Sequence, residues 1–91
     1  MALVMNFTPT AFTATKYNET LKKLEAAGVG SPKGRLYHVC FGSEDNLRVT
    51  DIWESQEEFD AFGQTLIPIM TELGVDPGQP EIATIYNIIK G

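Results

Sequence analysis

Apolar and polar residues follow six patterns along the chain, and these patterns predict four strands and two helices. Alternating apolar positions indicate strands, whereas apolar positions three and four residues apart indicate helices. The strands are predicted at residues 2–8, 35–41, 47–53 and 82–90, and the helices at residues 13–27 and 56–73. The order β-α-β-β-α-β predicts an α+β fold in which two helices cover one face of a four-stranded antiparallel sheet. We expect a single domain over residues 1–91.

The helix at 56–73 has the clearest sequence signals for its ends. Ser55 and Glu58 have the spacing of a capping box, in which the two side chains satisfy backbone N–H groups reciprocally. Gly74 is suited to end the helix, and Pro68 is expected to kink it because proline cannot donate a backbone hydrogen bond. An apolar stripe follows at helical spacing: Phe59, Phe62, Leu66, Ile69 and Leu73.

The strands at 35–41 and 47–53 are predicted to form a hairpin with a four- or five-residue loop, because residues 42–46 are turn-forming. If Gly42 lies opposite Leu47, then His38 lies opposite Asp51 and Leu36 opposite Trp53. A slip of one residue would instead bring His38 near Thr50 and Ile52. The sequence leaves both registers open.

Each predicted strand carries large apolar residues on both faces, as in Leu36 and Tyr37 or Ile88 and Ile89. A sheet exposed to water on one side would instead alternate between apolar and polar residues. We therefore expect a homodimer in which the sheet face without helices packs against the same face of a second copy. The alternative is a monomer that tolerates scattered apolar residues on its surface.

Composition narrows the classes of partner. The net charge is −5 and no basic cluster exceeds Lys22-Lys23, so nucleic-acid binding is not expected. No apolar run approaches the about 20 residues that a membrane span requires, and no signal peptide is expected. The single cysteine, Cys40, forms no intrachain disulfide. These features together predict a cytoplasmic protein.

One junction carries a family resemblance. The third strand ends in Trp53-Glu54-Ser55 and leads directly into Gln56-Glu57-Glu58-Phe59-Asp60-Ala61-Phe62. This junction and the order of elements resemble the dimeric α+β barrel superfamily, and within it the antibiotic-biosynthesis-type monooxygenases and their uncharacterised relatives. The resemblance implies a ferredoxin-like fold, two sheets that form a barrel across the dimer, and a small-molecule pocket between each sheet and its helices.

His38 and Asp51 are the predicted catalytic residues. His38 is the only histidine, and imidazole is the side chain that ordinarily titrates near neutral pH. It would act as a general base or as a hydrogen-bond donor to the substrate, oriented by Asp51 across the hairpin. The alternative is a histidine–aspartate hydrogen bond that only satisfies two polar groups within the sheet.

Asn6, Trp53 and Tyr86 are the predicted substrate-binding residues. Cofactor-free monooxygenases of the family resemble this chain in having an Asn on the first strand and a Trp at the end of the third. The resemblance implies that Asn6 bonds a phenolic oxygen and that Trp53 shapes an aromatic pocket. The alternative for Trp53 is a structural role, as a large aromatic side chain that packs in the hydrophobic core. Tyr17, Tyr37 and Tyr86 could each offer a hydroxyl, and the sequence does not rank them.

No cofactor and no metal is expected. The haem-degrading relatives use a histidine on the second helix, and residues 56–73 contain none. One His, one Cys and scattered carboxylates form no recognisable ligand set. The predicted function is a monooxygenase-like enzyme acting on a small aromatic or unsaturated carbonyl compound without a cofactor. The alternative is a non-catalytic dimeric module that binds a small hydrophobic ligand or has a stress-related interaction role.

Overall fold

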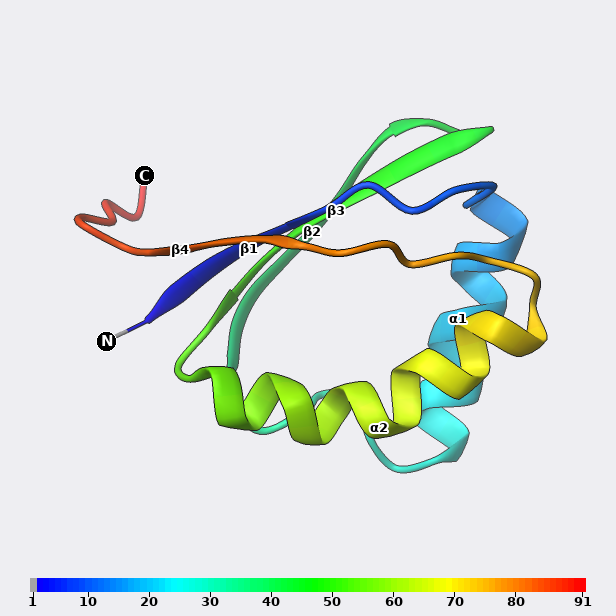
Figure 1. The fold of residues 1–91 in the computed structure, drawn as a ribbon, viewed down its shortest axis with the longest axis horizontal. Coiled ribbons are helices and arrows are strands. Elements are labelled where there is room, and N and C mark those ends of the chain that lie inside the picture. Colours follow the sequence, from blue (N-terminus) through cyan, green and yellow to red (C-terminus); the bar gives the residue numbers. More distant parts are fainter. Residues whose placement is uncertain (1) are drawn as a thin grey trace.

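The computed structural model describes residues 2–91, which form six elements in the predicted order. The strands are β1 (Leu3–Phe7), β2 (Arg35–Ser43), β3 (Asn46–Trp53) and β4 (Glu81–Thr84), and the helices are α1 (Ala14–Ala26) and α2 (Gln56–Glu72). The sheet is antiparallel with strand order β2-β3-β1-β4. Both helices lie on one side of it (Figure 1), which confirms the α+β prediction.

Each helix begins after a residue whose side chain caps a backbone N–H of its first turn. The Thr13 side chain accepts a hydrogen bond from the Lys16 N–H at 3.2 Å, and Ser55 Oγ accepts one from the Glu58 N–H at 3.2 Å. The Glu58 carboxylate accepts from the Ser55 hydroxyl at 3.1 Å, where the sequence predicted a bond to a backbone N–H, so only the Ser55 half of the capping box forms as expected. Helix α2 continues through Pro68, and its axis changes direction towards its C-terminal part (Figure 1).

The β2–β3 hairpin has the first of the two registers considered above, but its turn is shorter. His38 lies opposite Asp51, and Ser43 pairs with Asn46. Only two residues therefore connect the strands, because pairing continues into the segment expected to be loop. The register also shifts between Arg35 and Tyr37, and Arg35 lies opposite Trp53. The predicted pairing of Leu36 with Trp53 is wrong because Leu36 occupies a bulge.

The last strand is shorter than predicted. Strand β4 ends at Thr84, which pairs with Leu3 at the start of β1. The Ile85 N–H still donates to the Ala2 carbonyl, at 3.0 Å. Among the described residues the pairing of β1 with β4 ends here, and the apolar pattern of residues 85–90 forms no strand. Tyr86 is fully exposed.

The core fills the space between the sheet and the helices. Two clusters of buried residues meet there, and partly buried side chains such as Phe7 and Leu66 contact both. The first contains Met5, Leu24, Trp53 and Phe62, and the second contains Phe12, Val49, Met70 and Val75. None of the helices formed by residues 2–91 is long and apolar enough to cross a membrane.

Candidate functional site

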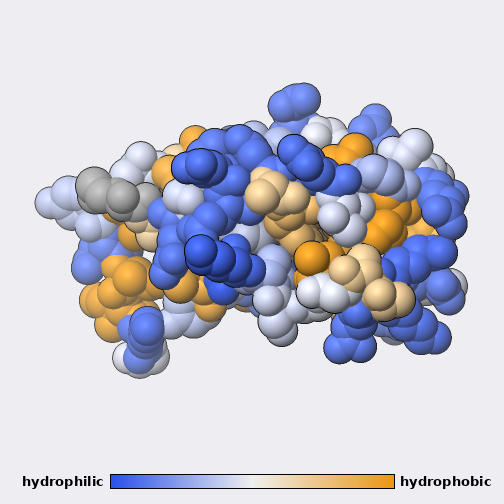
Figure 2. Space-filling model, turned by 90° about the horizontal axis from the view of Figure 1, so that it is seen from below, coloured by the Kyte–Doolittle hydropathy of each residue, from blue (hydrophilic) through white to orange (hydrophobic). Residues whose placement is uncertain are grey.

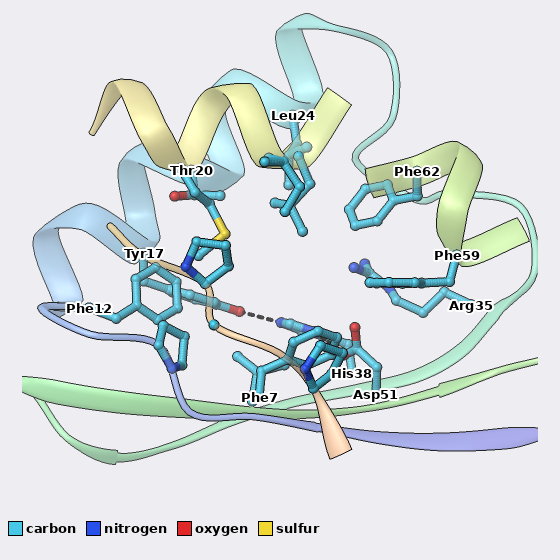
Figure 3. A pocket seen from close by; sticks show the side chains of 18 of the residues that line it. Phe7, Phe12, Tyr17, Thr20, Leu24, Arg35, His38, Asp51, Phe59 and Phe62 are labelled. Carbon is cyan, nitrogen blue, oxygen red and sulfur yellow. Dashed lines mark hydrogen bonds and ion pairs between the residues drawn. The ribbon is translucent and has the colours of Figure 1, made fainter. Parts of the chain in front are cut away.

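A cavity of about 230 Å³ lies between the sheet and both helices. Its walls are largely aromatic and aliphatic, as shown in Figure 3, and include Phe7, Phe12, Leu24, Phe59, Phe62 and Met70. Seen from the helix side, apolar side chains are visible among hydrophilic ones (Figure 2). Such a cavity suits a small, flat, hydrophobic molecule, provided that polar groups within it fix the orientation.

Four side chains form a continuous hydrogen-bonded chain at this cavity. His38 Nδ1 lies 2.6 Å from Asp51 Oδ1, and His38 Nε2 lies 2.8 Å from the Tyr17 hydroxyl (Figure 3). Trp53 Nε1 donates to Asp51 Oδ2 at 3.3 Å. A carboxylate only accepts, so the Nδ1 hydrogen of His38 points to Asp51. In neutral His38, Nε2 then accepts from the Tyr17 O–H.

The chain runs from the protein interior to the cavity. Asp51 is 4% exposed and Trp53 is completely buried, whereas Tyr17, His38 and Asp51 border the cavity. Burial raises the pKa of the Tyr17 hydroxyl above its usual value of 10.0; the charges of Cys40 and Asp51 act in the same direction, and Arg35 acts against them. Tyr17 is therefore a neutral hydroxyl at physiological pH, able to donate and to accept.

Three of the five predicted site residues come together, and two lie elsewhere. His38 and Asp51 border the cavity, and Trp53 lies behind Asp51, with its ring centroid 5.4 Å from those of Phe59 and Phe62. Asn6 is exposed on the other face of the sheet, where it accepts a hydrogen bond from Thr50 at 2.7 Å. Tyr86 is exposed beyond β4. Neither Asn6 nor Tyr86 borders this cavity, so their ligand contacts stay predictions.

Two further residues join the site, Tyr17 and Arg35. Tyr17 is on the apolar stripe of α1, and the sequence offers no reason to prefer it among three tyrosines. Arg35 borders the cavity because the bulge at Leu36 turns it to the same face as His38. The bulge does not alter the alternation of residue types along this short strand, so the sequence pattern does not reveal it. The register shift would have been needed to find Arg35, and the packing of α1 against the sheet to find Tyr17.

Within residues 2–91, no three or more His, Cys, Asp or Glu side chains gather as a metal ion would require. Cys40 is half-buried on β2, and burial raises the pKa of its thiol above 9.0. A protonated thiol is a poor nucleophile and a poor metal ligand. The titratable and charged side chains that line the cavity are Tyr17, Arg35, His38 and Asp51.

No protein-family model matches the chain, and no curated protein sequence does either. Solved structures do match. The cofactor-independent oxygenase SnoaB from Streptomyces nogalater has a TM-score of 0.60 at 19% identity, with 99% of this chain and 96% of SnoaB covered. A protein provisionally named an antibiotic biosynthesis monooxygenase, from Chloroflexus aurantiacus, has a TM-score of 0.59 at 14% identity, with 98% and 95% covered.

The structural-genomics protein YJCS has a TM-score of 0.65 at 11% identity, with 93% of this chain and 99% of that protein covered. Identities this low establish a common fold and leave the reaction open. The resemblance expected from the sequence is confirmed at that level: the chain has the ferredoxin-like α+β fold of antibiotic-biosynthesis-monooxygenase-like proteins.

Proposed function

We propose that this chain is a monooxygenase-like enzyme that oxidises a small aromatic or unsaturated carbonyl compound without a cofactor. The observation that carries the proposal is the hydrogen-bonded chain from Asp51 through His38 to Tyr17, which ends at a largely apolar cavity. A histidine held by a carboxylate is a suitable general base. The fold shared with a cofactor-independent oxygenase supports the same reading.

The arrangement can remove a proton from a substrate with an acidic O–H or C–H bond. The Tyr17 oxygen accepts that proton while the Tyr17 hydrogen passes to His38 Nε2, 2.8 Å away. Asp51 stabilises the resulting imidazolium through Nδ1. The substrate becomes an electron-rich enolate or phenolate, which reacts with dioxygen directly. For an activated methylene the balance is R₂CH₂ + O₂ → R₂C=O + H₂O, so the substrate supplies all the electrons.

The test is dioxygen uptake with a panel of quinols and polyphenols, measured with an oxygen electrode against the protein-free oxidation rate. His38→Gln and Tyr17→Phe should lower the uptake by about 10²–10⁴-fold, which is the usual contribution of general acid–base catalysis. Thr50→Val, on the other face of the same sheet, should leave it unchanged. Uptake that never exceeds the protein-free rate with any compound would contradict the enzymatic proposal.

A non-catalytic ligand-binding module is the second candidate. It is favoured by one observation: both ring nitrogens of His38 already have protein partners, as in a purely structural network. A thermal-shift screen with the same panel distinguishes the two candidates. A ligand that binds the native state raises the melting temperature whether or not it is oxidised, so stabilisation without dioxygen uptake would favour the module.

We also propose that the protein is a cytoplasmic homodimer that associates through the sheet face without helices. Tyr37, Val39 and Phe41 project from that face of β2 and are 38%, 52% and 40% exposed. A row of large apolar side chains on one strand favours a partner surface. The family resemblance and the symmetry of homodimers make a second copy of this chain the occupant that we propose.

A further inference from the structure

We propose that the natural ligand of the cavity carries a carboxylate, and that Arg35 binds this carboxylate. The inference rests on the proposed function in one respect, that the cavity is the ligand site. It adds the chemical class of the ligand and assigns a specificity residue. The chain brings the Arg35 guanidinium to a cavity whose wall is largely apolar.

The bulge at Leu36 determines where Arg35 lies. Arg35 pairs with Trp53 and Tyr37 pairs with Ile52, so one extra residue of β2 separates the two pairs. A regular strand would put Arg35 and Tyr37 on the same face. The bulge instead turns Arg35 towards the helices, on the face of His38. Bulges of this kind often redirect a side chain next to a functional site.

The guanidinium has few partners within the protein. One nitrogen, Nη2, donates to the Gly30 carbonyl at 3.4 Å, and the guanidinium carbon lies 5.8 Å from the centre of the Phe62 ring. Arginine has five N–H donors. Among the described residues the ion pairs are Lys23–Glu72 and His38–Asp51, so no carboxylate of that part of the chain pairs with Arg35.

The charge of Arg35 acts inside the cavity. It is the one contribution that lowers the pKa of Tyr17 against the effect of burial, so its field reaches the far end of the hydrogen-bonded chain. In Figure 3, Arg35 lies beside Phe59 and Phe62, and Tyr17 lies on the opposite side of His38. A flat ligand that places an anion at Arg35 would therefore present its other end to Tyr17 and His38.

A carboxylate fits this position better than other anions. Two parallel N–H groups of a guanidinium match the two oxygens of a carboxylate, and such forked pairs are strong and directional. A phosphate would bring a second negative charge and a third oxygen, whereas Arg35 is the only Lys or Arg among the described residues that line the cavity. Aromatic side chains beside Arg35 suit a ring that carries the carboxylate directly.

The test compares naphthoate with naphthamide, which have the same shape but differ in charge, by isothermal titration calorimetry at pH 7. The wild type should bind naphthoate about 10- to 100-fold more tightly, because hydrogen bonds to charged groups are the stronger ones. Arg35→Gln should abolish this preference. Lys33→Gln removes the same charge from an exposed side chain two residues away and should preserve the preference.

Arg35→Lys is the second variant, because it keeps the apolar stem and the charge but loses the fork. It should retain a weaker preference for the acid. Equal affinities of the wild type for acid and amide, or a preference that persists in Arg35→Gln, would overturn the inference and leave the cavity as a ligand site. Failure of the wild type to bind either compound would contradict the ligand site itself, and the inference with it.

Discussion

His38 and Asp51 face each other across the β2–β3 pair, with Nδ1 of the imidazole 2.6 Å from Oδ1 of the carboxylate. The other carboxylate oxygen accepts from the Trp53 indole at 3.3 Å. Asp51 is thus a buried acceptor for two donors, one from the cavity and one from the core. Its two hydrogen bonds link the candidate site to the most buried aromatic side chain of the molecule.

The first prediction concerns this carboxylate. Asp51→Asn should lower the free energy of unfolding by about 1–3 kcal/mol, because the amide nitrogen would face the N–H donor of either His38 or Trp53 and leave one hydrogen bond unmade. Urea unfolding measures the change. Asp60→Asn is the control, since Asp60 is exposed and an amide oxygen can still accept from Gln56. A loss below about 0.5 kcal/mol for Asp51→Asn would contradict the prediction.

Much of this fold could be predicted because its elements follow clear periods. The apolar stripe and capping residues of α2 determine that helix locally. The His38–Asp51 contact also follows from the sequence, on the condition that Gly42 lies opposite Leu47, and the structure meets that condition. What the sequence could not supply was the choice between two registers, because apolar residues on both faces make a one-residue slip inexpensive.

The remaining features depend on contacts distant in the sequence. The bulge at Leu36 determines the position of Arg35 and changes no residue pattern. The apolar residues Ile88 and Ile89 are typical of a strand, yet the pairing of β4 with β1 ends at Thr84 and Leu3, followed by one hydrogen bond between Ile85 and Ala2. Tyr17 reaches His38 only because α1 packs over β2 with a particular rotation. Helical spacing predicts which residues of α1 form its apolar stripe. It does not predict which residue of the sheet each of them contacts.

The second prediction follows from the raised pKa of Tyr17. Between pH 10.0, where an unfolded tyrosine titrates, and the higher native value, the folded protein holds a proton that the unfolded chain has lost. Stability should therefore fall as pH rises through this window, and not below it. In Tyr17→Phe this part of the alkaline loss should be absent, as measured by urea unfolding across pH 8–12.

Absorbance of tyrosinate provides the direct readout for the same variant. The tyrosine that titrates at the highest pH should disappear in Tyr17→Phe and persist in Tyr86→Phe, whose side chain is fully exposed. Both variants are best made in a Cys40→Ala background. Burial also raises the pKa of the Cys40 thiol, so its titration would also change the free energy of unfolding with pH. A late-titrating tyrosine that survives Tyr17→Phe would show that another side chain is responsible.

The third prediction concerns the backbone just before Arg35. Gly34 has a φ of +89°, and a Cβ there would lie 2.5 Å from Cδ and 2.8 Å from Cβ of Glu58. Gly34→Ala should therefore destabilise the protein by about 1–3 kcal/mol through strain and the clash. Gly63→Ala, inside α2 with open space around the added Cβ, should stabilise it by about 0.5–1 kcal/mol. Equal effects of the two substitutions on the urea midpoint would contradict this account.

The fourth prediction addresses the proposed dimer. Val39 is 52% exposed in the middle of β2, on the face away from the helices. In a two-fold interface each copy would contribute the same residue, so Val39→Lys would bring two like charges into an apolar contact. The wild type should sediment at twice 10.0 kDa at micromolar concentration, and Val39→Lys should shift towards the monomer. Thr71→Lys adds the same charge to an exposed position of α2 and should remain dimeric. A wild type that sediments as a monomer would contradict the proposal, because its exposed apolar row would then have no partner of its own kind.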